Sequence, residues 1–249
     1  APILANSDVL GMGLLNTLKL TGTALTFGVP LGLSLALLRL SRWRLLSMPA
    51  GLLVEFFRTT PPLVQLFWFF FALPILVQVE MTPFVAAAIT FSIQSAAFFA
   101  EVFRAGIVSI ERGQSEAALA LGMSGQQAMR RVILPQAVKR MIPAFMERSV
   151  ELMKTTTLVA TVSYADLLFQ ANELAQKTFR PLEVFTVTAL IYFAVIYAAS
   201  LIVHRLERRR RCGGVAGGAR RSAQNRSDTG AAAVARGACA SPSASRRGR

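Results

Sequence analysis

Cysteine and histidine are almost absent from this sequence. Two cysteines occur among 249 residues, Cys212 and Cys239, and both lie near the C-terminal end. Two thiols in one such stretch predict neither a disulfide framework nor a metal-binding set. The single histidine, His204, directly follows the last apolar segment, so the chain has no Ser-His-Asp arrangement and no cluster of metal ligands. The sequence therefore shows no catalytic constellation.

Charged residues are also few, at 16%, whereas 53% of the residues are hydrophobic. This composition places the chain in the membrane class rather than the soluble class. The formal net charge of +14 is typical of nucleic-acid binding, but +10 of it comes from the last 45 residues, which hold twelve arginines and two acids. The remainder carries only +4, so we expect no nucleic-acid partner.

The tail, 212–249, consists mainly of alanine, glycine, serine and arginine. It has little apolar surface to bury, and we expect it to be disordered. It could bind RNA or anionic lipid, and attraction to the inner leaflet of a membrane is the favoured alternative. At the other end, no basic-then-apolar leader with a cleavage site follows Ala1, so the first apolar segment is expected to be a retained anchor unless the true start is missing.

Long apolar runs dominate the rest of the sequence. Five of them approach the roughly 20 residues that cross a bilayer as a helix, which predicts an all-α integral membrane protein. The predicted spans are Leu14–Leu38, a segment within Met48–Val79, Thr82–Val108, Ile142–Val162 and Leu182–Val203.

Arginines gather in the stretches 39–44, 104–140 and 205–211. The positive-inside rule then predicts that these stretches lie in the cytoplasm and that the N-terminus lies outside. The domain limits that follow are an external segment 1–13, a membrane domain 14–211 with a cytoplasmic loop 109–141, and a cytoplasmic tail. The connection 163–180 is expected to be an external loop.

The second span contains the run Thr-Thr-Pro-Pro at 59–62. A proline pair at this depth predicts a helix that bends or restarts there, with Leu63–Leu76 as the strongly apolar part.

The longest polar interruption, 113–143, predicts two short helices set at an angle. Ser115 can cap a first helix, Glu116–Leu121, with Glu116 at the positive end of its dipole. Gly122 supplies a left-handed residue that ends this helix. Ser124 and Gln127 form a capping box that starts a second helix, and Pro135 is expected to disrupt or end it.

The pattern Glu-Ala-Ala, three residues, Gly, nine residues, aliphatic-x-Leu-Pro resembles the cytoplasmic loop of permease subunits of binding-protein-dependent ABC importers. Seven positions carry the resemblance: Glu116, Ala117, Ala118, Gly122, Val132, Leu134 and Pro135. An ordinary amphipathic helix pair between two spans is the alternative. The resemblance implies that this loop couples the chain to a separate ATPase.

Three further segments resemble the polar amino-acid branch of that family. They are 57–66 around the Thr-Thr-Pro run, 101–107 with the following Glu-Arg-Gly-Gln, and 154–158, which is similar to the family's Lys-x-Thr-Ser-Leu. For the first, a plain interfacial helix start is an equal alternative. The chain departs from the family in having Phe98 where tyrosine is usual and Glu147 where asparagine is common.

Polar residues inside the predicted spans are candidates for a substrate path. Ionisable groups at membrane depth are costly and tend to face a partner or a wet cavity. The candidates are Gln94, Glu101, Glu151 and Lys154. Glu151 and Lys154 are three residues apart and able to pair on one helix face, and a purely structural ion pair is the alternative.

The resemblance implies one half of a channel-forming dimer, with a type I-like transmembrane domain, in an ATP-driven importer of polar or charged amino acids in the bacterial inner membrane. The implied partners are two ATP-binding cassette subunits, a second permease subunit, a periplasmic solute-binding protein and the lipid bilayer. The chain has no Gly-x-x-x-x-Gly-Lys-Ser/Thr, so ATP and Mg²⁺ are expected on the partner ATPase subunits. An ion-gradient-driven secondary transporter and a non-transporting membrane scaffold are the alternatives.

Overall fold

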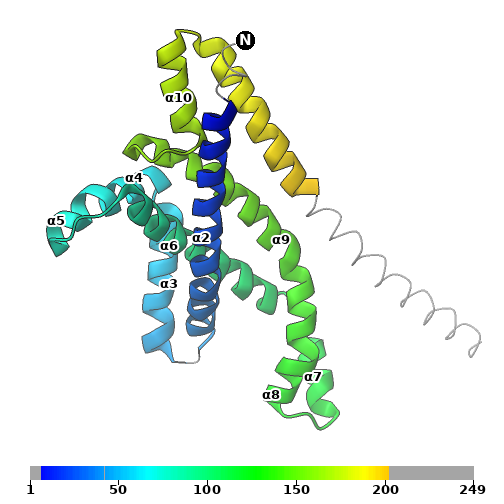
Figure 1. The fold of residues 1–249 in the computed structure, drawn as a ribbon. Coiled ribbons are helices and arrows are strands. Elements are labelled where there is room, and N and C mark those ends of the chain that lie inside the picture. The colour runs from blue at the N-terminus through cyan, green and yellow to red at the C-terminus, as the bar shows by residue number, and fades with distance from the viewer. Residues whose placement is uncertain (1–6, 42, 202–249) are drawn as a thin grey trace, which may run out of the picture. The chain divides into compact units, whose positions relative to one another are not determined.

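The computed structural model describes residues 7–41 and 43–201. This part of the chain is helical and contains no strand, which confirms the predicted all-α class. The tail and its cysteines lie outside the described residues. The segments predicted to face opposite sides of a membrane, α7–α8 and α10, lie at opposite ends of the described part (Figure 1).

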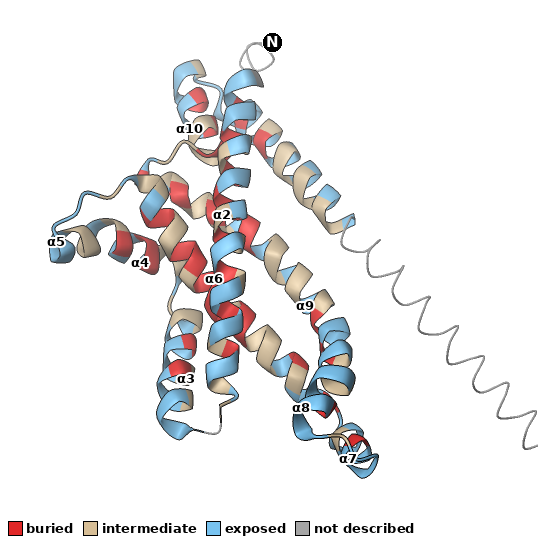
Figure 2. Ribbon diagram, turned by 60° about the horizontal axis from the view of Figure 1, so that its bottom comes forward, coloured by how far each residue is buried: buried red, intermediate tan, exposed pale blue. Residues whose placement is uncertain are grey.

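Two long helices, α2 (Ser7–Arg39) and α6 (Pro83–Val108), pack against each other along much of their length. Glycines allow their backbones to approach closely. A Cβ at Gly28 would overlap the Ser95 hydroxyl oxygen, and one at Gly32 would lie 2.8 Å from the Ala96 carbonyl oxygen. Small residues at a contact between membrane helices permit close van der Waals packing, and Figure 2 shows α6 as the most buried helix.

The second predicted span is broken at the proline pair, as expected. Helix α3 (Arg44–Thr59) ends before it and α4 (Pro62–Phe67) begins inside it. The axis turns by 104° between Arg44–Thr59 and Pro62–Val77. The Gln65 side-chain amide donates to the carbonyl oxygens of Phe57 (2.9 Å) and Thr60 (3.0 Å), which holds the two arms of this corner together.

Two short π-helical segments each end one residue before a Leu-Pro pair. Segment η1 (Trp68–Ala72) leads into α5 (Leu73–Val77), and η2 (Met129–Ile133) leads into α9 (Leu134–Thr155). A proline lacks an N–H, and its ring clashes with the carbonyl four residues earlier in an α-helix. A π-turn shifts that register and removes the conflict. The expectation that Pro135 disrupts or ends its helix is therefore only partly right, because the chain remains helical through it.

Three described helices are long and apolar enough to cross a membrane: Asp8–Arg39, Pro83–Val108 and Pro181–Leu201. The bent pair α3 with α4–α5 can serve as a fourth. The predicted span Ile142–Val162 corresponds to the second half of α9 followed by the 3₁₀ segment η3 (Thr156–Val162). It carries four charged residues and does not qualify by composition, so the count of five spans stays a prediction.

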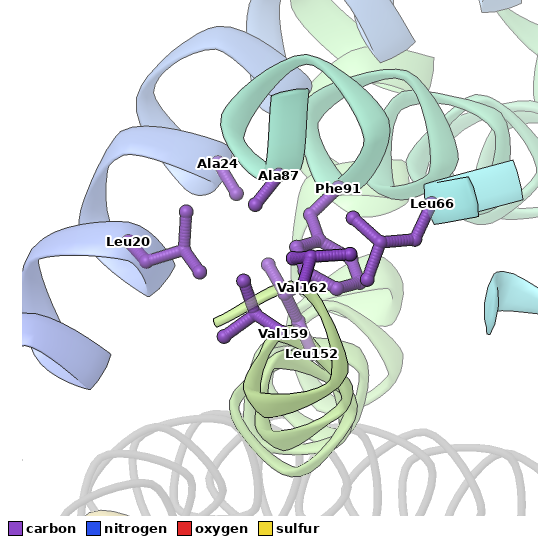
Figure 3. Packing of buried hydrophobic residues seen from close by; sticks show 8 residues of the cluster. All are labelled: Leu20, Ala24, Leu66, Ala87, Phe91, Leu152, Val159 and Val162. Carbon is purple, nitrogen blue, oxygen red and sulfur yellow. The ribbon is translucent and has the colours of Figure 1, made fainter. Parts of the chain in front are cut away.

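The largest apolar cluster joins segments far apart in the sequence (Figure 3). Its members come from α2, α4, α6, α9 and η3: Leu20, Ala24, Leu66, Ala87, Phe91, Leu152, Val159 and Val162. This cluster holds the charged helix α9 against the apolar pair α2 and α6.

The predicted external loop 163–180 is largely helical, which corrects the sequence analysis. Helix α10 (Leu167–Thr178) begins at Asp166, whose carboxylate accepts a hydrogen bond from the Phe169 N–H at 2.8 Å. Buried residues follow a helical spacing of four, three and one: Leu167, Ala171, Leu174 and Ala175. They pack with Leu10 and Val184. This spacing predicts an amphipathic helix and was available in the sequence.

Candidate functional site

The segment between α6 and α9 forms a compact helical turn. Helix α7 spans Arg112–Ala120 and α8 spans Gly125–Ala128. The N–H of Met123 donates to the Ala118 carbonyl (3.2 Å), and the N–H of Gly122 donates to the Leu119 carbonyl (2.9 Å). These two bonds make a Schellman motif. Gly122 has the predicted positive φ, +79°.

The start of α7 differs from the prediction. The helix begins at Arg112, and the Ser115 hydroxyl lies inside it and donates to the Arg112 carbonyl (2.7 Å). Glu116 is therefore in the middle of α7 and not at its positive end, because the helix extends one turn further toward α6. The predicted capping box at α8 is confirmed, with Ser124 and Gln127 bonded reciprocally at 3.0 and 3.3 Å.

The predicted coupling residues fall into two groups. Ala118 is buried at 3% exposure and packs inside the turn, as does Ala128 at 2%. The others, Glu116, Ala117, Gly122, Leu134 and Pro135, are exposed. Leu121 projects beside them with 80% of its surface exposed. The turn therefore presents a small, partly apolar surface held in shape by buried alanines.

Two pockets lie between α6, α9 and the corner of α3 and α4. The first has a volume of about 100 Å³, and its lining includes Arg58, Gln94, Phe98, Arg148 and Glu151. The second has a volume of about 440 Å³ and is lined in part by Arg58, Phe98, Glu101, Arg140 and Arg148.

Arg58, Phe98 and Arg148 line both pockets and therefore form the partition between them. The Arg148 guanidinium carbon lies 3.5 Å from the centre of the Phe98 ring, and that of Arg58 lies 5.8 Å from it. Both distances are within the range in which a cation is attracted to an aromatic face. We call these three residues the constriction.

Glu101 is the centre of an ion-pair cluster beside the second pocket. Its carboxylate binds Arg39 at 2.7 Å and accepts from Arg104 at 2.6 and 3.1 Å. Arg58 lies 3.9 Å from the same carboxylate. The cluster ties together α2, α3 and α6.

The predicted path residues separate in the structure. Gln94 and Glu151 line the first pocket and Glu101 lines the second, whereas Lys154 is exposed and is absent from the lining of either. Glu151 pairs with Arg148 at 3.0 Å, so the expected pair with Lys154 is wrong. Arg148 and Lys154 are each three residues from Glu151, but Arg148 lies on the side of α9 that faces Phe98.

Sequence analysis missed the constriction as a functional group. The sequence pattern covers Arg58 only as part of the segment 57–66 and Phe98 only as a departure from tyrosine. The available signal was a pair of arginines at membrane depth, since such charges are costly unless they face a wet cavity or a partner.

Comparison with known proteins identifies the family of the chain. Residues 28–211 match the family model described as the binding-protein-dependent transport system inner membrane component. The chain belongs to this family. Family membership favours a transport subunit over the secondary transporter and the scaffold.

Named relatives cover most of the chain. It is 37% identical over 204 residues to the glutamate/aspartate import permease protein GltK of Escherichia coli O6:H1, which covers 79% of this chain and 91% of GltK. It is 36% identical over 202 residues to the L-cystine transport system permease protein TcyB of Bacillus subtilis, covering 81% and 86%. A crystal structure of an amino acid ABC transporter with histidines has a chain with a TM-score of 0.80 and 35% identity, covering 84% of this chain and 97% of that chain.

Proposed function

We propose that the chain is the transmembrane subunit of an ATP-driven amino-acid importer and forms half of its translocation pathway. The observation that carries this proposal is the pair of pockets, each lined by charged side chains, that meet at Arg58, Phe98 and Arg148 in a family of membrane transport components. The named relatives, which are amino-acid permeases, support the substrate class.

The substrate path runs along the face of α6 and α9 that carries both pockets. Gln94, Glu151 and Glu101 contact the substrate or the water around it in turn. Lys154 is exposed on α9, three residues beyond Glu151, and serves a surface shared with the second permease subunit. An exposed charged side chain at this depth needs such a wet or protein-lined surface.

The α7–α8 turn docks on a partner ATPase. Glu116, Ala117 and Leu121 form the contact surface, while Ala118 and Gly122 set its shape and Leu134 and Pro135 join it to α9. Two ATP-binding cassette subunits bind ATP and Mg²⁺, and this chain contributes no ATPase site. A solute-binding protein delivers the substrate from outside. The arginine-rich stretches 39–44, 104–140 and 205–211 face the cytoplasm, so the N-terminus lies outside and the C-terminus in the cytoplasm.

Transport requires at least two conformations, and each partner shifts the equilibrium only through contacts that differ between them. Helix α9 connects the α7–α8 turn, which we call the docking turn, to the two pockets. It begins beside this turn and carries Arg148 and Glu151 at the pockets. A tilt of α9 driven by the ATPase would move Arg148 relative to Phe98. The constriction then opens on one side at a time.

Co-purification tests the proposal. The complex is purified through this chain from its native membrane and reconstituted in proteoliposomes with its binding protein. We expect an ATPase to co-purify and its turnover to rise when substrate-loaded binding protein is added. Uptake that is driven by an ion gradient and continues without any ATPase would contradict the proposal. A purified complex that contains no ATPase and transports no amino acid would contradict it as well.

A further inference from the structure

We propose that the pathway selects amino acids with a second carboxylate, and that Arg58 and Arg148 at the constriction bind that carboxylate. The inference rests on the proposed function and specifies its substrate class. It is argued from the charges that line the two pockets and from the hydrogen-bonding groups that face them.

The lining of both pockets has an excess of positive charge. The first is lined by two arginines, Arg58 and Arg148, and one acid, Glu151. The second is lined by the same two arginines, Arg140, and one acid, Glu101. A guanidinium stays protonated at any physiological pH. An amino acid with net charge −1 neutralises the excess in the first pocket, whereas a cationic amino acid would double it.

Arg58 has donor capacity left over. Its Nε is buried and has no hydrogen-bond partner among the described residues. Its nearest carboxylates are those of Glu55 at 3.4 Å and Glu101 at 3.9 Å, both longer than a good charge-assisted bond. Arg58 lies fourteen residues along α3 from Arg44, which is about 21 Å at 1.5 Å per residue. Arg58 is therefore well separated along the helix from the arginines at 39–44 that are expected at the inner interface.

The acid at the second pocket is already occupied. The Glu101 carboxylate is bound by Arg39 and Arg104 through three contacts of 2.6 to 3.1 Å. Its single negative charge is shared between those two guanidinium groups and leaves Arg58 without a close carboxylate partner, while Arg148 has only Glu151 at 3.0 Å. A guanidinium presents a planar fork that matches a carboxylate, and two such groups face the same Phe98 ring.

The first pocket also offers partners for the rest of an amino acid. Glu151 is bound to Arg148, and a substrate carboxylate that takes over Arg148 frees Glu151 to accept from an ammonium group. The Gln94 amide is 4% exposed, lines the pocket and makes no side-chain hydrogen bond with the described residues. It is placed to bind the α-carboxylate. A basic side chain would lie beside two guanidinium groups instead.

The test is direct binding to the permease–ATPase complex purified without its binding protein, so that the binding protein's own selectivity does not contribute. The probes are L-glutamate, L-glutamine and L-arginine, measured by calorimetry. Glutamine has nearly the shape of glutamate without its second charge. We expect glutamate to bind about ten-fold or more tightly than glutamine, because charge-assisted bonds are the stronger ones, and arginine to bind most weakly.

Arg58→Gln should remove most of the preference for glutamate over glutamine, and Arg58→Lys should reduce it, because an ammonium keeps the charge but loses the fork. Arg44→Gln is the matched control, since Arg44 lies on the same helix and is exposed away from both pockets; it should keep the wild-type preference. If Arg58→Gln fails to assemble, Arg58→Lys alone decides.

Equal binding of glutamate and glutamine, tightest binding of arginine, or an unchanged preference in Arg58→Lys would overturn the inference. The response of ATPase turnover to loaded binding protein is measured on the same preparation. A normal response with no preference for glutamate contradicts only the substrate class. Absence of any response in the wild type contradicts the proposed function, and the inference that rests on it falls as well.

Discussion

The docking turn and the constriction are organised by different physics. In the docking turn, bonds between residues at most five apart set the geometry: the Schellman motif at Gly122 and the capping box at Ser124. At the constriction, residues from α3, α6 and α9 meet across large sequence separations. The first kind of geometry is encoded locally and is largely exposed, and the second depends on how three helices pack. Mutations in the docking turn should therefore alter coupling to the ATPase. Mutations at the constriction and its neighbouring ion pairs should alter stability or substrate selectivity.

The largest effect is expected from reversing the exposed charge on the docking turn. Glu116 lies in the middle of α7 and makes no ion pair with the described residues. Glu116→Lys should leave folding and membrane levels unchanged while the ATPase stops responding to loaded binding protein. The measurement is stimulated ATPase turnover, with Glu111→Lys as a control just outside the helix. If Glu116→Lys also lowers the thermal midpoint of the complex clearly below that of the wild type and of Glu111→Lys, the loss of turnover would reflect a structural role of Glu116 instead.

The next effect tests long-range packing. Glu101→Gln leaves Arg39 and Arg104 without their carboxylate, and removing one partner of a partly buried ion pair is destabilising. We expect a loss of about 1–3 kcal/mol, measured as a lower thermal midpoint of the complex in detergent. Glu183→Gln is the matched control, because Glu183 also pairs three residues away with an arginine, Arg180, but on an exposed surface. That change should cost at most about 1 kcal/mol. If both substitutions lower the thermal midpoint equally, the Glu101 ion-pair cluster contributes no more to stability than an exposed ion pair.

A smaller effect concerns Asp166, which packing has buried completely. Burial raises its pKa from 3.8 to about 6. The folded chain therefore keeps a proton that the unfolded chain has lost between these values. The resulting stability is fully present below about pH 4 and is lost as pH rises through 6, and two pKa units amount to about 3 kcal/mol at most.

Asp166→Asn should remove this component, because asparagine caps a helix about as well as aspartate. The thermal midpoint of the wild type, followed from pH 4 to pH 7, should fall more steeply than that of the variant. Asp8→Asn, at an exposed position near the start of α2, is the control and should keep the wild-type slope. Parallel curves for the wild type and Asp166→Asn would contradict the assignment.

The smallest effect is expected from removing residues 213–249, which lie outside the described residues. Their composition offers almost no apolar surface for packing, and the inner arginines 205–211 remain to anchor the last span. Insertion and uptake should both be retained. Loss of uptake at normal membrane levels would indicate an unknown partner for the tail.

The features that could be predicted from the sequence are the ones set by neighbouring residues, and the features that depend on helix packing were missed. Gly122 and the capping box were predictable because each depends on a few neighbouring residues. The bend at 59–62 was predictable because proline acts locally. The true start of α7 was missed because Glu111 and Arg112 give no strong start signal, whereas Ser115 is a favoured capping residue. The passage of a helix through Pro135 needed the π-turn of η2.

The long-range contacts were not predictable in the same way. Arg148 and Lys154 are equally spaced from Glu151, and nothing local distinguishes them as its partner. The choice depends on the side of α9 that faces α6, which is set by the apolar cluster around Leu152 and Phe91. The meeting of Arg58, Phe98 and Arg148 likewise depends on the packing of α3 and α9 against α6.

The most direct test of the coupling account is a pair of substitutions at Gly122. A β-branched residue is opposed at a φ of +79°, at a cost of about 1 kcal/mol or more, whereas asparagine tolerates this conformation. No neighbouring atom lies within 4 Å of a Cβ built there, so the two variants differ in backbone preference rather than in clashes. The measurement is binding-protein-stimulated ATPase turnover of the reconstituted complex. We predict that Gly122→Val reaches the membrane but no longer responds, while Gly122→Asn responds as the wild type does. A wild-type response in Gly122→Val would contradict the docking role of this turn.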